Sequence, residues 1–172
     1  MKTRAAIIER EGGDLSIEEI ELAEPGPGEV RVKIEASGIC RSDLHAIDGG
    51  EVIVFPAVLG HEAAGRIDDI GSGVEGIEVG QRVILSWTPA CRRCPYCLKG
   101  EPQLCSGLRM SEGGGGPMSR GAQGLDRFMA LGSFAEHVVV PASMAVPVAG
   151  EHPAASLCLI GCGVMTGFGA AA

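Results

Sequence analysis

The stretch EVRVKIEASGI, Glu29–Ile39, decides the fold that this sequence predicts. It is short, rich in β-branched residues, and alternates in part between apolar and polar side chains, as a half-buried strand does. A turn cluster of proline and glycine, AEPGPGE at 23–29, leads into it. We therefore interpret Glu29–Ile39 as a strand that follows a tight turn.

Further stretches of the same kind lie on both sides of it. They are TRAAIIER (3–10), LSIEEIEL (15–22), AAGRIDDIG (63–71), GQRVILSW (80–87), SFAEHVVVP (133–141) and MAVPV (144–148). Short strands at this spacing predict a β-barrel or a β-sandwich. Helical signals are few: SDLHAI at 42–47, with Ser42 as a candidate N-cap, HPAASLCLI at 152–160 and GVMTGFGAAA at 163–172.

Composition limits the class of protein. The 172 residues are 45% hydrophobic but only 3% aromatic, which predicts one compact domain with a core of Val, Ile, Leu and Ala. A net charge of −8 argues against nucleic-acid binding, which depends on neutralising phosphates. No apolar run reaches the roughly 20 residues that span a bilayer, and no export signal begins the chain. We therefore expect a cytoplasmic protein without nucleic-acid or membrane partners.

Four of the seven cysteines form a cluster in CRRCPYCLKGEPQLC. In a reducing compartment such a count indicates metal binding or catalysis rather than disulfides. The spacing is C-x2-C-x2-C-x7-C, and four thiolates this close can surround one tetrahedral Zn²⁺ with no open position, which predicts a structural zinc. The ligands would be Cys91, Cys94, Cys97 and Cys105.

Two other metal sites compete for this cluster. An iron–sulfur cluster would follow the first two gaps, but the last gap is seven residues rather than about three, and no proline follows Cys105. A nucleic-acid zinc ribbon would use two CxxC pairs on a longer arm, and the acidic charge argues against it. A structural zinc therefore remains the prediction.

The segment Ser106–Gly132 differs from the rest of the chain. It contains SEGGGGPMSRGAQG, has no apolar period, and predicts a flexible surface loop. No strand leads into its glycine run and no Lys-Ser/Thr helix start leaves it, so a phosphate-binding loop is not predicted.

A second group of metal-ligating residue types is dispersed along the chain. Two thiolates and one imidazole can hold Zn²⁺ with a fourth position free for water or substrate. Each residue also has a plain structural interpretation, such as a packed core thiol or a turn histidine. Spacing alone does not select Cys162 over Cys158, which we interpret as a core residue. The candidate site residues, ligands and polar neighbours together, are Cys40, Arg41, Ser42, Asp43, His45, His61, Glu62 and Cys162.

Five motifs, in this order and spacing, resemble the catalytic part of the zinc-dependent medium-chain alcohol dehydrogenases. They are GICRSDLH (38–45), FPAVLGHEAAG (55–65), VGQRVILSWTPAC (79–91), the four-cysteine run and LIGCGVMTG (159–167). The resemblance covers the chain from about Val30 to its end and is least anchored over Ser106–Gly132. It implies a mainly β fold with short helices, a GroES-like partial β-barrel over residues 1–172 with a structural-zinc lobe at 91–105.

The resemblance also implies the metal ligands. Cys40, His61 and Cys162 would bind a catalytic zinc and the four-cysteine run a structural zinc, which makes two Zn²⁺ per chain. Asp43 resembles the carboxylate that accepts a hydrogen bond from the ligand imidazole. Glu62 lies where the family keeps a carboxylate near the metal, and a simple salt-bridge partner is the alternative for it.

Other residues resemble the family's substrate and cofactor contacts. Ser42 resembles the hydroxyl relay beside the bound alcohol, and His45 the group that passes the proton to solvent. Arg41 resembles a contact to the cofactor phosphates. Thr166 resembles a contact on the nicotinamide side, with a plain helix-interior threonine as the alternative. Trp87 matches a substrate-pocket aromatic position, and the main core anchor is its alternative.

The implied function is NAD(P)-dependent oxidation of an alcohol to an aldehyde or ketone, with zinc as Lewis acid. Family members continue into a Rossmann domain, and no G-x-G-x-x-G lies here between a strand and a helix. We therefore expect residues 163–172 to begin the helix that leads to that domain, and the chain to lack independent activity.

The alternative is a non-enzymatic zinc-binding β module for metal storage, redox sensing or assembly. The expected substrate is a small-molecule alcohol or aldehyde, and a homo-oligomer is left open. Glu51 and Arg109 are either polar groups at the pocket edge or solvated loop residues.

Overall fold

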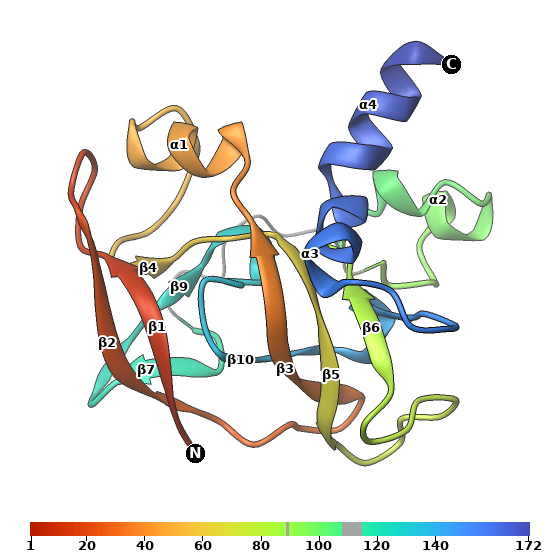
Figure 1. Ribbon diagram of the computed structural model, residues 1–172, viewed down its shortest axis with the longest axis horizontal. Coiled ribbons are helices and arrows are strands. Elements are labelled where there is room, and N and C mark those ends of the chain that lie inside the picture. The colour runs from red at the N-terminus through yellow and green to blue at the C-terminus, as the bar shows by residue number, and fades with distance from the viewer. Residues whose placement is uncertain (89, 108–114) are drawn as a thin grey trace.

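A computed structural model describes residues 1–88, 90–107 and 115–172 of the chain. Across these residues the strands form two sheets, ordered β8-β7-β2-β1-β4-β9 and β10-β3-β5-β6-β11 (Figure 1). The strands are β1 Lys2–Ile8, β2 Leu15–Leu22, β3 Glu29–Gly38, β4 Ala57–Val58, β5 Glu62–Ile70, β6 Arg82–Leu85, β7 Met118–Arg120, β8 Gln123–Gly124, β9 Asp126–Arg127, β10 His137–Pro141 and β11 Ala145–Pro147.

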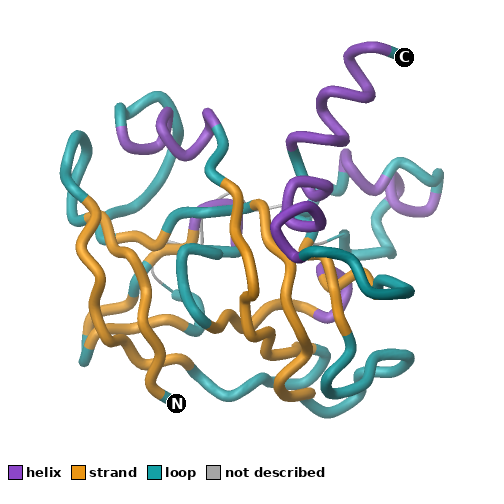
Figure 2. The backbone as a smooth tube through the Cα atoms, viewed as in Figure 1, coloured by secondary structure: helices purple, strands orange, loops and turns teal. Residues whose placement is uncertain are grey.

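The helices are short and lie mostly outside the sheets (Figure 2). In Figure 1, α1 and α4 rise from the same end of the sheets, and α4 extends away from them. The α-helices are α1 Arg41–Ile47, α2 Pro95–Leu98, α3 Ala154–Leu157 and α4 Gly163–Ala171, and the 3₁₀ segments are η1 Pro102–Leu104, η2 Phe128–Ala130, η3 Ala142–Met144 and η4 Cys158–Gly161.

The two sheets are joined along residues 133–136. Ala5 forms a bridge with Ala135, and the Ala6 N–H donates to the Phe134 carbonyl at 2.8 Å. On the other side, the Ile34 N–H donates to the Glu136 carbonyl at 2.9 Å. One segment therefore connects β1 to β3 and partly closes the structure. The mainly β fold with short helices, predicted as a partial barrel, is confirmed.

The core between the sheets is aliphatic, as the low aromatic content predicts. Its fully buried members come from both sheets and include Ile7, Val32, Val83, Leu125 and Val139. A smaller cluster contains Leu59 and Phe128. Burial of such side chains removes apolar area from water, at about 25 cal/mol for each Å².

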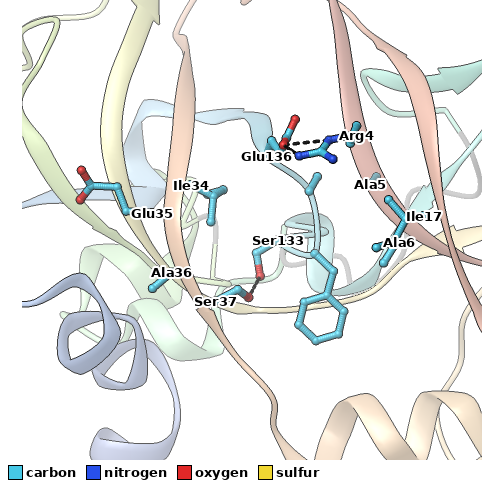
Figure 3. Close-up of a pocket in the computed structure, with 12 residues that line it drawn as sticks. Arg4, Ala5, Ala6, Ile17, Ile34, Glu35, Ala36, Ser37, Ser133 and Glu136 are labelled. Carbon is cyan, nitrogen blue, oxygen red and sulfur yellow. Dashed lines mark hydrogen bonds and ion pairs between the residues drawn. The ribbon is translucent and has the colours of Figure 1, made fainter.

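An open groove of about 360 Å³ remains between the two sheets (Figure 3). Its walls come from β1, β2, β3 and the connecting segment 133–136. The Ser37 and Ser133 hydroxyls are hydrogen-bonded at 2.8 Å in it, and Arg4 pairs with Glu136 at its rim. The groove is thus polar as well as apolar, and its walls are not formed by the cysteine-bearing segments.

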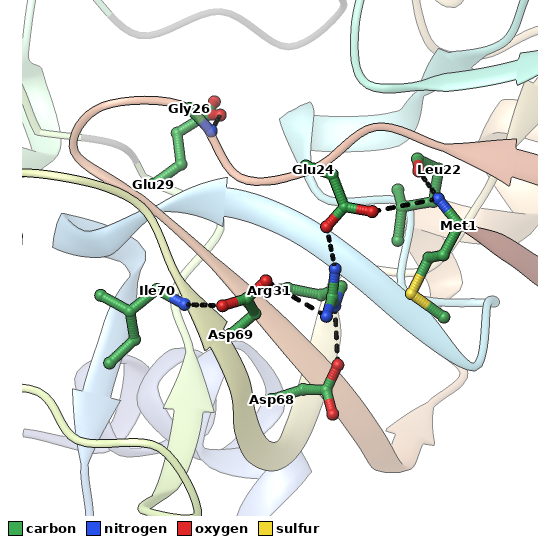
Figure 4. A network of polar contacts seen from close by, with 9 residues as sticks. All are labelled: Met1, Leu22, Glu24, Gly26, Glu29, Arg31, Asp68, Asp69 and Ile70. Carbon is green, nitrogen blue, oxygen red and sulfur yellow. Dashed lines mark hydrogen bonds and ion pairs between the residues drawn. The ribbon is translucent and has the colours of Figure 1, made fainter.

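Arg31, near the start of β3, ties three segments together (Figure 4). Its guanidinium lies 2.5 Å from a Glu24 carboxylate oxygen in the loop after β2 and 2.6 Å from Asp68 on β5. The Arg31 side chain is 13% exposed, whereas its acidic partners are more exposed. The cluster therefore fixes the end of the β3–β5 pair that lies away from α1 and α4.

Two details of the sequence interpretation are wrong. The segment Ser106–Gly132 is not a flexible surface loop in its described part, because β7, β8, β9 and η2 lie there and Met118, Leu125 and Phe128 are buried. Strands of two or three residues are too short to show a period. The N-cap of α1 is Cys40 rather than Ser42, which lies inside the helix.

Among the described residues, no single helix is long and apolar enough to cross a membrane. The helical segments Ala154–Gly161 and Gly163–Ala171 reach the required length and hydropathy only when taken together, and they are bent by 57°.

Candidate metal centres

The four cysteines of the predicted zinc lobe lie together on the loop after β6. Their sulfur atoms all lie within 4.8 Å of one another, and those of Cys94 and Cys105 are 3.9 Å apart. Four sulfurs around a tetrahedral zinc, each about 2.3 Å from the ion, would be roughly 3.8 Å apart. The arrangement therefore has the size of a closed four-thiolate site. Its members are Cys91, Cys94, Cys97 and Cys105.

Backbone N–H groups of the same segment point at these sulfurs. The Cys94 N–H donates to the Cys91 sulfur at 3.3 Å, and the Gly107 N–H to the Cys105 sulfur at 3.3 Å. N–H donors from Cys97 and Ser106 lower the pKa of Cys94 to about 5. Burial and the neighbouring Cys94 sulfur raise the pKa of Cys97 to about 12. The lobe therefore favours a thiolate before any ion is considered, and a thiolate is the form that binds metal.

A second cluster brings together side chains from three separate segments. Its candidate ligand atoms belong to Cys40, His61, Glu62 and Cys162 and lie within 4.8 Å of one another. Cys40 follows the end of β3, His61 comes directly before β5, and the antiparallel β3–β5 pair places these chain positions side by side. Cys162 lies between η4 and α4, with its sulfur 3.9 Å from that of Cys40.

The imidazole of His61 has one nitrogen that is satisfied and one that is not. It is fully buried, and its Nδ1 lies 3.3 Å from Asp43 Oδ1. Its Nε2 is buried without a hydrogen-bond partner among the described residues. When Nδ1–H donates to a carboxylate, Nε2 is a free lone pair, which is the form that binds a metal. This unpaired nitrogen beside two thiols fits an ion held by Cys40, His61 and Cys162.

Asp43 accepts hydrogen bonds from several groups of this centre. Its side chain is 1% exposed and also accepts hydrogen bonds from the Cys40 N–H at 2.9 Å and the Gly60 N–H at 3.0 Å. Burial alone would lower the pKa of His61, but Asp43 and the Cys40 sulfur outweigh burial and raise it. Asp43 thus holds both the imidazole ring of His61 and the backbone N–H groups of Cys40 and Gly60.

The predicted relay residues lie on α1, which begins directly after Cys40. Ser42 is half-buried, with its Oγ 3.8 Å from the Cys40 sulfur. His45 is exposed, and its Nε2 accepts a hydrogen bond from Arg41 at 3.1 Å. Thr166 is exposed on α4, one turn after Cys162. Among the described residues, no hydrogen bond joins Ser42 to His45.

The chain also matches a known protein family. The model of the alcohol dehydrogenase GroES-like domain matches residues 26–150, most of the chain. The chain belongs to this alcohol dehydrogenase family. The GroES-like character of the predicted fold is thereby confirmed.

Curated alcohol dehydrogenases are similar to the chain over almost its whole length. S-(hydroxymethyl)glutathione dehydrogenase of Komagataella pastoris is 43% identical over 99% of the chain and 47% of the relative. The NDMA-dependent alcohol dehydrogenase of Amycolatopsis methanolica is 40% identical over 99% of the chain and 47% of the relative. The chain thus spans about half the length of these relatives.

Solved structures of this family have the same fold. An alcohol dehydrogenase zinc-binding domain protein from Burkholderia ambifaria superposes with a TM-score of 0.91 at 32% identity, over 99% of the chain and 48% of that structure. Benzyl alcohol dehydrogenase from Acinetobacter calcoaceticus gives a TM-score of 0.89 at 32% identity, over 99% of the chain and 47% of that structure. At these values the likeness extends to the whole described barrel.

Several sequence alternatives can now be decided. Cys158 is 3% exposed and packs with Ala64 and Leu157, so its interpretation as a core residue is confirmed. Trp87 is half-buried against the smaller cluster and is not the main core anchor. Glu62 forms no ion pair among the described residues; instead, its Oε1 accepts the Gly163 N–H at 3.1 Å.

Of the two groups predicted for the pocket edge, one lies in the part of the chain that the structure describes. Glu51 is half-buried in the stretch between α1 and β4. Arg109 lies outside the described residues.

Sequence reasoning missed one side chain that lies beside the Cys40–His61–Cys162 cluster. The Phe128 ring stands edge-on to His61, with ring centroids 5.5 Å apart and an interplanar angle of 81°. Phe128 lies in the segment that was predicted to be a loop, so nothing in the sequence assigned it to the centre. Its burial between β9 and the connecting segment limits the movement of the imidazole.

Proposed function

We propose that the chain is the zinc-binding catalytic domain of an NAD(P)-dependent alcohol dehydrogenase and that it binds two Zn²⁺. The observation that carries the proposal is the buried Nε2 of His61, unpaired among the described residues and grouped with the thiols of Cys40 and Cys162. The four-cysteine lobe would hold the second ion in a structural role.

When bound, zinc would polarise an alcohol or carbonyl oxygen, and the nicotinamide would accept or return a hydride. The chain's own residues orient these groups. Asp43 holds the imidazole of His61 in one tautomer, so that the ring meets the ion through Nε2. The thiolates of Cys40 and Cys162 offset part of the ion's positive charge.

Proton transfer would use the exposed side of α1. Ser42, half-buried beside Cys40, would accept the proton of the alcohol while releasing its own hydroxyl proton, and the exposed His45 would be the group that delivers a proton to solvent. Arg41 and Thr166 are exposed on α1 and α4 and would contact the dinucleotide. Trp87 would border the substrate pocket. The residue set therefore provides an oriented metal ligand and an outlet for the proton.

The substrate would be a small-molecule alcohol or aldehyde. Hydroxymethyl thioethers are the first class to test, because relatives act by name on S-(hydroxymethyl)glutathione. The net charge of −8 supports the absence of nucleic-acid partners, and the seven free cysteines support a cytoplasmic location. A homo-oligomer is compatible with this function.

Native mass spectrometry of the 172-residue chain, purified without added metal, tests the proposal. We expect two zinc ions per chain, and one in Cys162→Ser. Cys97→Ser is the matched control, and it should lose the other ion. Loss of both ions from Cys162→Ser would contradict the division into two independent sites.

A further inference from the structure

Cys162 lies at a break between two helical segments. Ala154–Gly161 and Gly163–Ala171 are bent by 57°, and the backbone of Cys162 itself is neither helical nor extended (φ −141°, ψ −72°). The first N–H groups of a helix have no partners within that helix. The position of the Cys162 thiol therefore depends on what satisfies the N–H groups that follow it.

Glu62 is the partner of the first of these groups. Its Oε1 accepts the Gly163 N–H at 3.1 Å, and Glu62 is 3% exposed. It directly follows His61 and is the first residue of β5. His61 is thus a candidate metal ligand, and the next residue, Glu62, contacts Gly163, which follows the candidate ligand Cys162. The hydrogen bond thus ties Cys162 to the strand that begins after His61.

Gly38 provides the space that Glu62 occupies. In the β3–β5 pair, Gly38 lies directly opposite Glu62. A Cβ at position 38 would overlap Glu62 Oε2 and would lie 3.0 Å from Leu159 Cδ2 in η4. Any side chain there would displace either the carboxylate or the segment that leads to Cys162. A glycine two residues before Cys40 is therefore required by the contact of Glu62.

We propose that Glu62 is a positioning residue, whose hydrogen bond to the Gly163 N–H holds the Cys162 thiol against Cys40 and His61. The proposal rests on the proposed function, in which these three residues bind a metal. It assigns Glu62 an action through the backbone of Gly163, in contrast to direct ligation or to an effect of its charge alone.

Cobalt(II) titration of the 172-residue chain under anaerobic conditions tests this role, because thiolate-bound cobalt has a spectrum that depends on its ligands. Glu62→Gln keeps the acceptor oxygen and removes the charge, whereas Glu62→Ala removes both. We expect Glu62→Gln to bind cobalt like the wild type, with the same spectrum. Glu62→Ala and Gly38→Ala should weaken the Cys40–His61–Cys162 site by about 10- to 100-fold.

Far-UV circular dichroism checks the fold of every variant, and the four-cysteine lobe should bind cobalt unchanged as the internal reference. Glu35→Ala, which removes a carboxylate of the same strand pair that contacts Arg66 and Arg82, is the matched control and should bind like the wild type. Amide exchange at Gly163, followed by NMR, should accelerate in Glu62→Ala and remain slow in Glu62→Gln.

Two results would overturn the positioning role. One is a Glu62→Gln variant that binds as weakly as Glu62→Ala or has an altered cobalt spectrum, which would indicate a charge effect or direct ligation. The other is a Glu62→Ala variant that binds as tightly as the wild type. A wild-type chain that binds cobalt only in the four-cysteine lobe would instead contradict the proposed function, and this inference with it.

Discussion

The two cysteine centres of this chain are built in opposite ways. In the four-cysteine lobe, Cys91 and Cys105 are 14 positions apart, and N–H groups of the same segment point at the sulfurs. In the second centre, Cys40 and Cys162 are 122 positions apart, and His61 comes from a third segment. The lobe is therefore a property of local sequence, whereas the dispersed centre is a property of the whole fold.

The surroundings of the two centres differ in the same sense. The thiols are similar in burial, since Cys40 and Cys162 are half-buried like three of the four lobe cysteines, but the dispersed centre also contains His61 and Asp43, which are almost completely inaccessible to solvent. A dispersed centre can be adjusted by groups from several segments, such as Asp43 on α1, Glu62 on β5 and Phe128 in η2. From the same dependence we expect the dispersed centre to lose its metal when the barrel unfolds.

The largest expected effect separates the two centres in denaturant. Zinc bound to a short cysteine-rich segment is worth about 10–16 kcal/mol at neutral pH, which is comparable to the whole stability of a domain, about 5–15 kcal/mol. As urea unfolds the barrel, we expect the dispersed centre to release its ion with the global transition and the lobe to keep its ion to higher urea. A chromophoric chelator would follow the release. Simultaneous release of both ions would contradict the comparison.

The next largest effect is expected from Asp43→Ala. The substitution leaves the buried donors of Gly60 and His61 and the part-buried N–H of Cys40 without their acceptor. Unpaired buried donors are worth about 1–3 kcal/mol each, so the unfolding free energy of the metal-free chain should fall by about 3 kcal/mol or more. Urea unfolding measures this change. Asp43→Asn, which keeps one acceptor oxygen, should lose less, and an equal loss would contradict the hydrogen-bond account.

The contrast between local and dispersed also explains what the sequence could predict. The strand at Glu29–Ile39 and its neighbours were readable because a half-buried strand longer than about four residues has a visible alternation. The four-cysteine lobe was readable because spacing alone specifies it. For the dispersed centre, spacing left Cys162 and Cys158 equivalent, and only the resemblance of LIGCGVMTG to a family motif distinguished them.

What the sequence missed consists of contacts between distant segments. β9 has two residues and pairs in parallel with β4, so neither strand has a pattern of its own. Phe128 follows β9 directly, and its approach to His61 was hidden by the glycine-rich surroundings. The hydrogen bond between Glu62 and Gly163 spans 101 positions and involves a backbone group that no motif marks. Tertiary structure supplies these contacts, and no local preference encodes them.

A smaller effect is expected from Phe128→Leu. The edge-to-face contact with His61 is worth about 0.5–1.5 kcal/mol, and a modest cavity adds to its loss. Urea unfolding should show a decrease of about 1–2 kcal/mol. The dispersed centre should bind cobalt more weakly, while the lobe is unaffected. Phe134→Leu, in the connecting segment, is the control for the loss of an aromatic ring. Equal weakening of both metal sites by Phe128→Leu would contradict a specific role beside His61.

Arg31→Ala tests whether metal release from the dispersed centre follows the stability of the barrel, because it changes no residue near the centre. Arg31 lies at the opposite end of the β3–β5 pair and contacts neither cluster. Because its partners are exposed, screening by solvent limits the loss of unfolding free energy to about 1 kcal/mol. We expect the dispersed ion to be released at a correspondingly lower urea concentration and the lobe ion at the unchanged one. A shift of the lobe transition would show that the lobe depends on the barrel after all.

The smallest effect is the pH dependence of the same cluster. Hydrogen bonds from Arg31 and from the N-terminal amine lower the pKa of Glu24 below its ordinary value of 4.5. The folded chain therefore holds the ionised form more strongly than the unfolded chain does, and the resulting stability is present above pH 4.5 and is lost as the pH falls through the lowered pKa. Urea unfolding of the metal-free wild type and of Glu24→Gln should differ at pH 7 and converge in acid. A difference that stays constant with pH would show that Glu24 acts by packing. The charge of Glu24 would then not contribute to the barrel stability on which the dispersed centre depends.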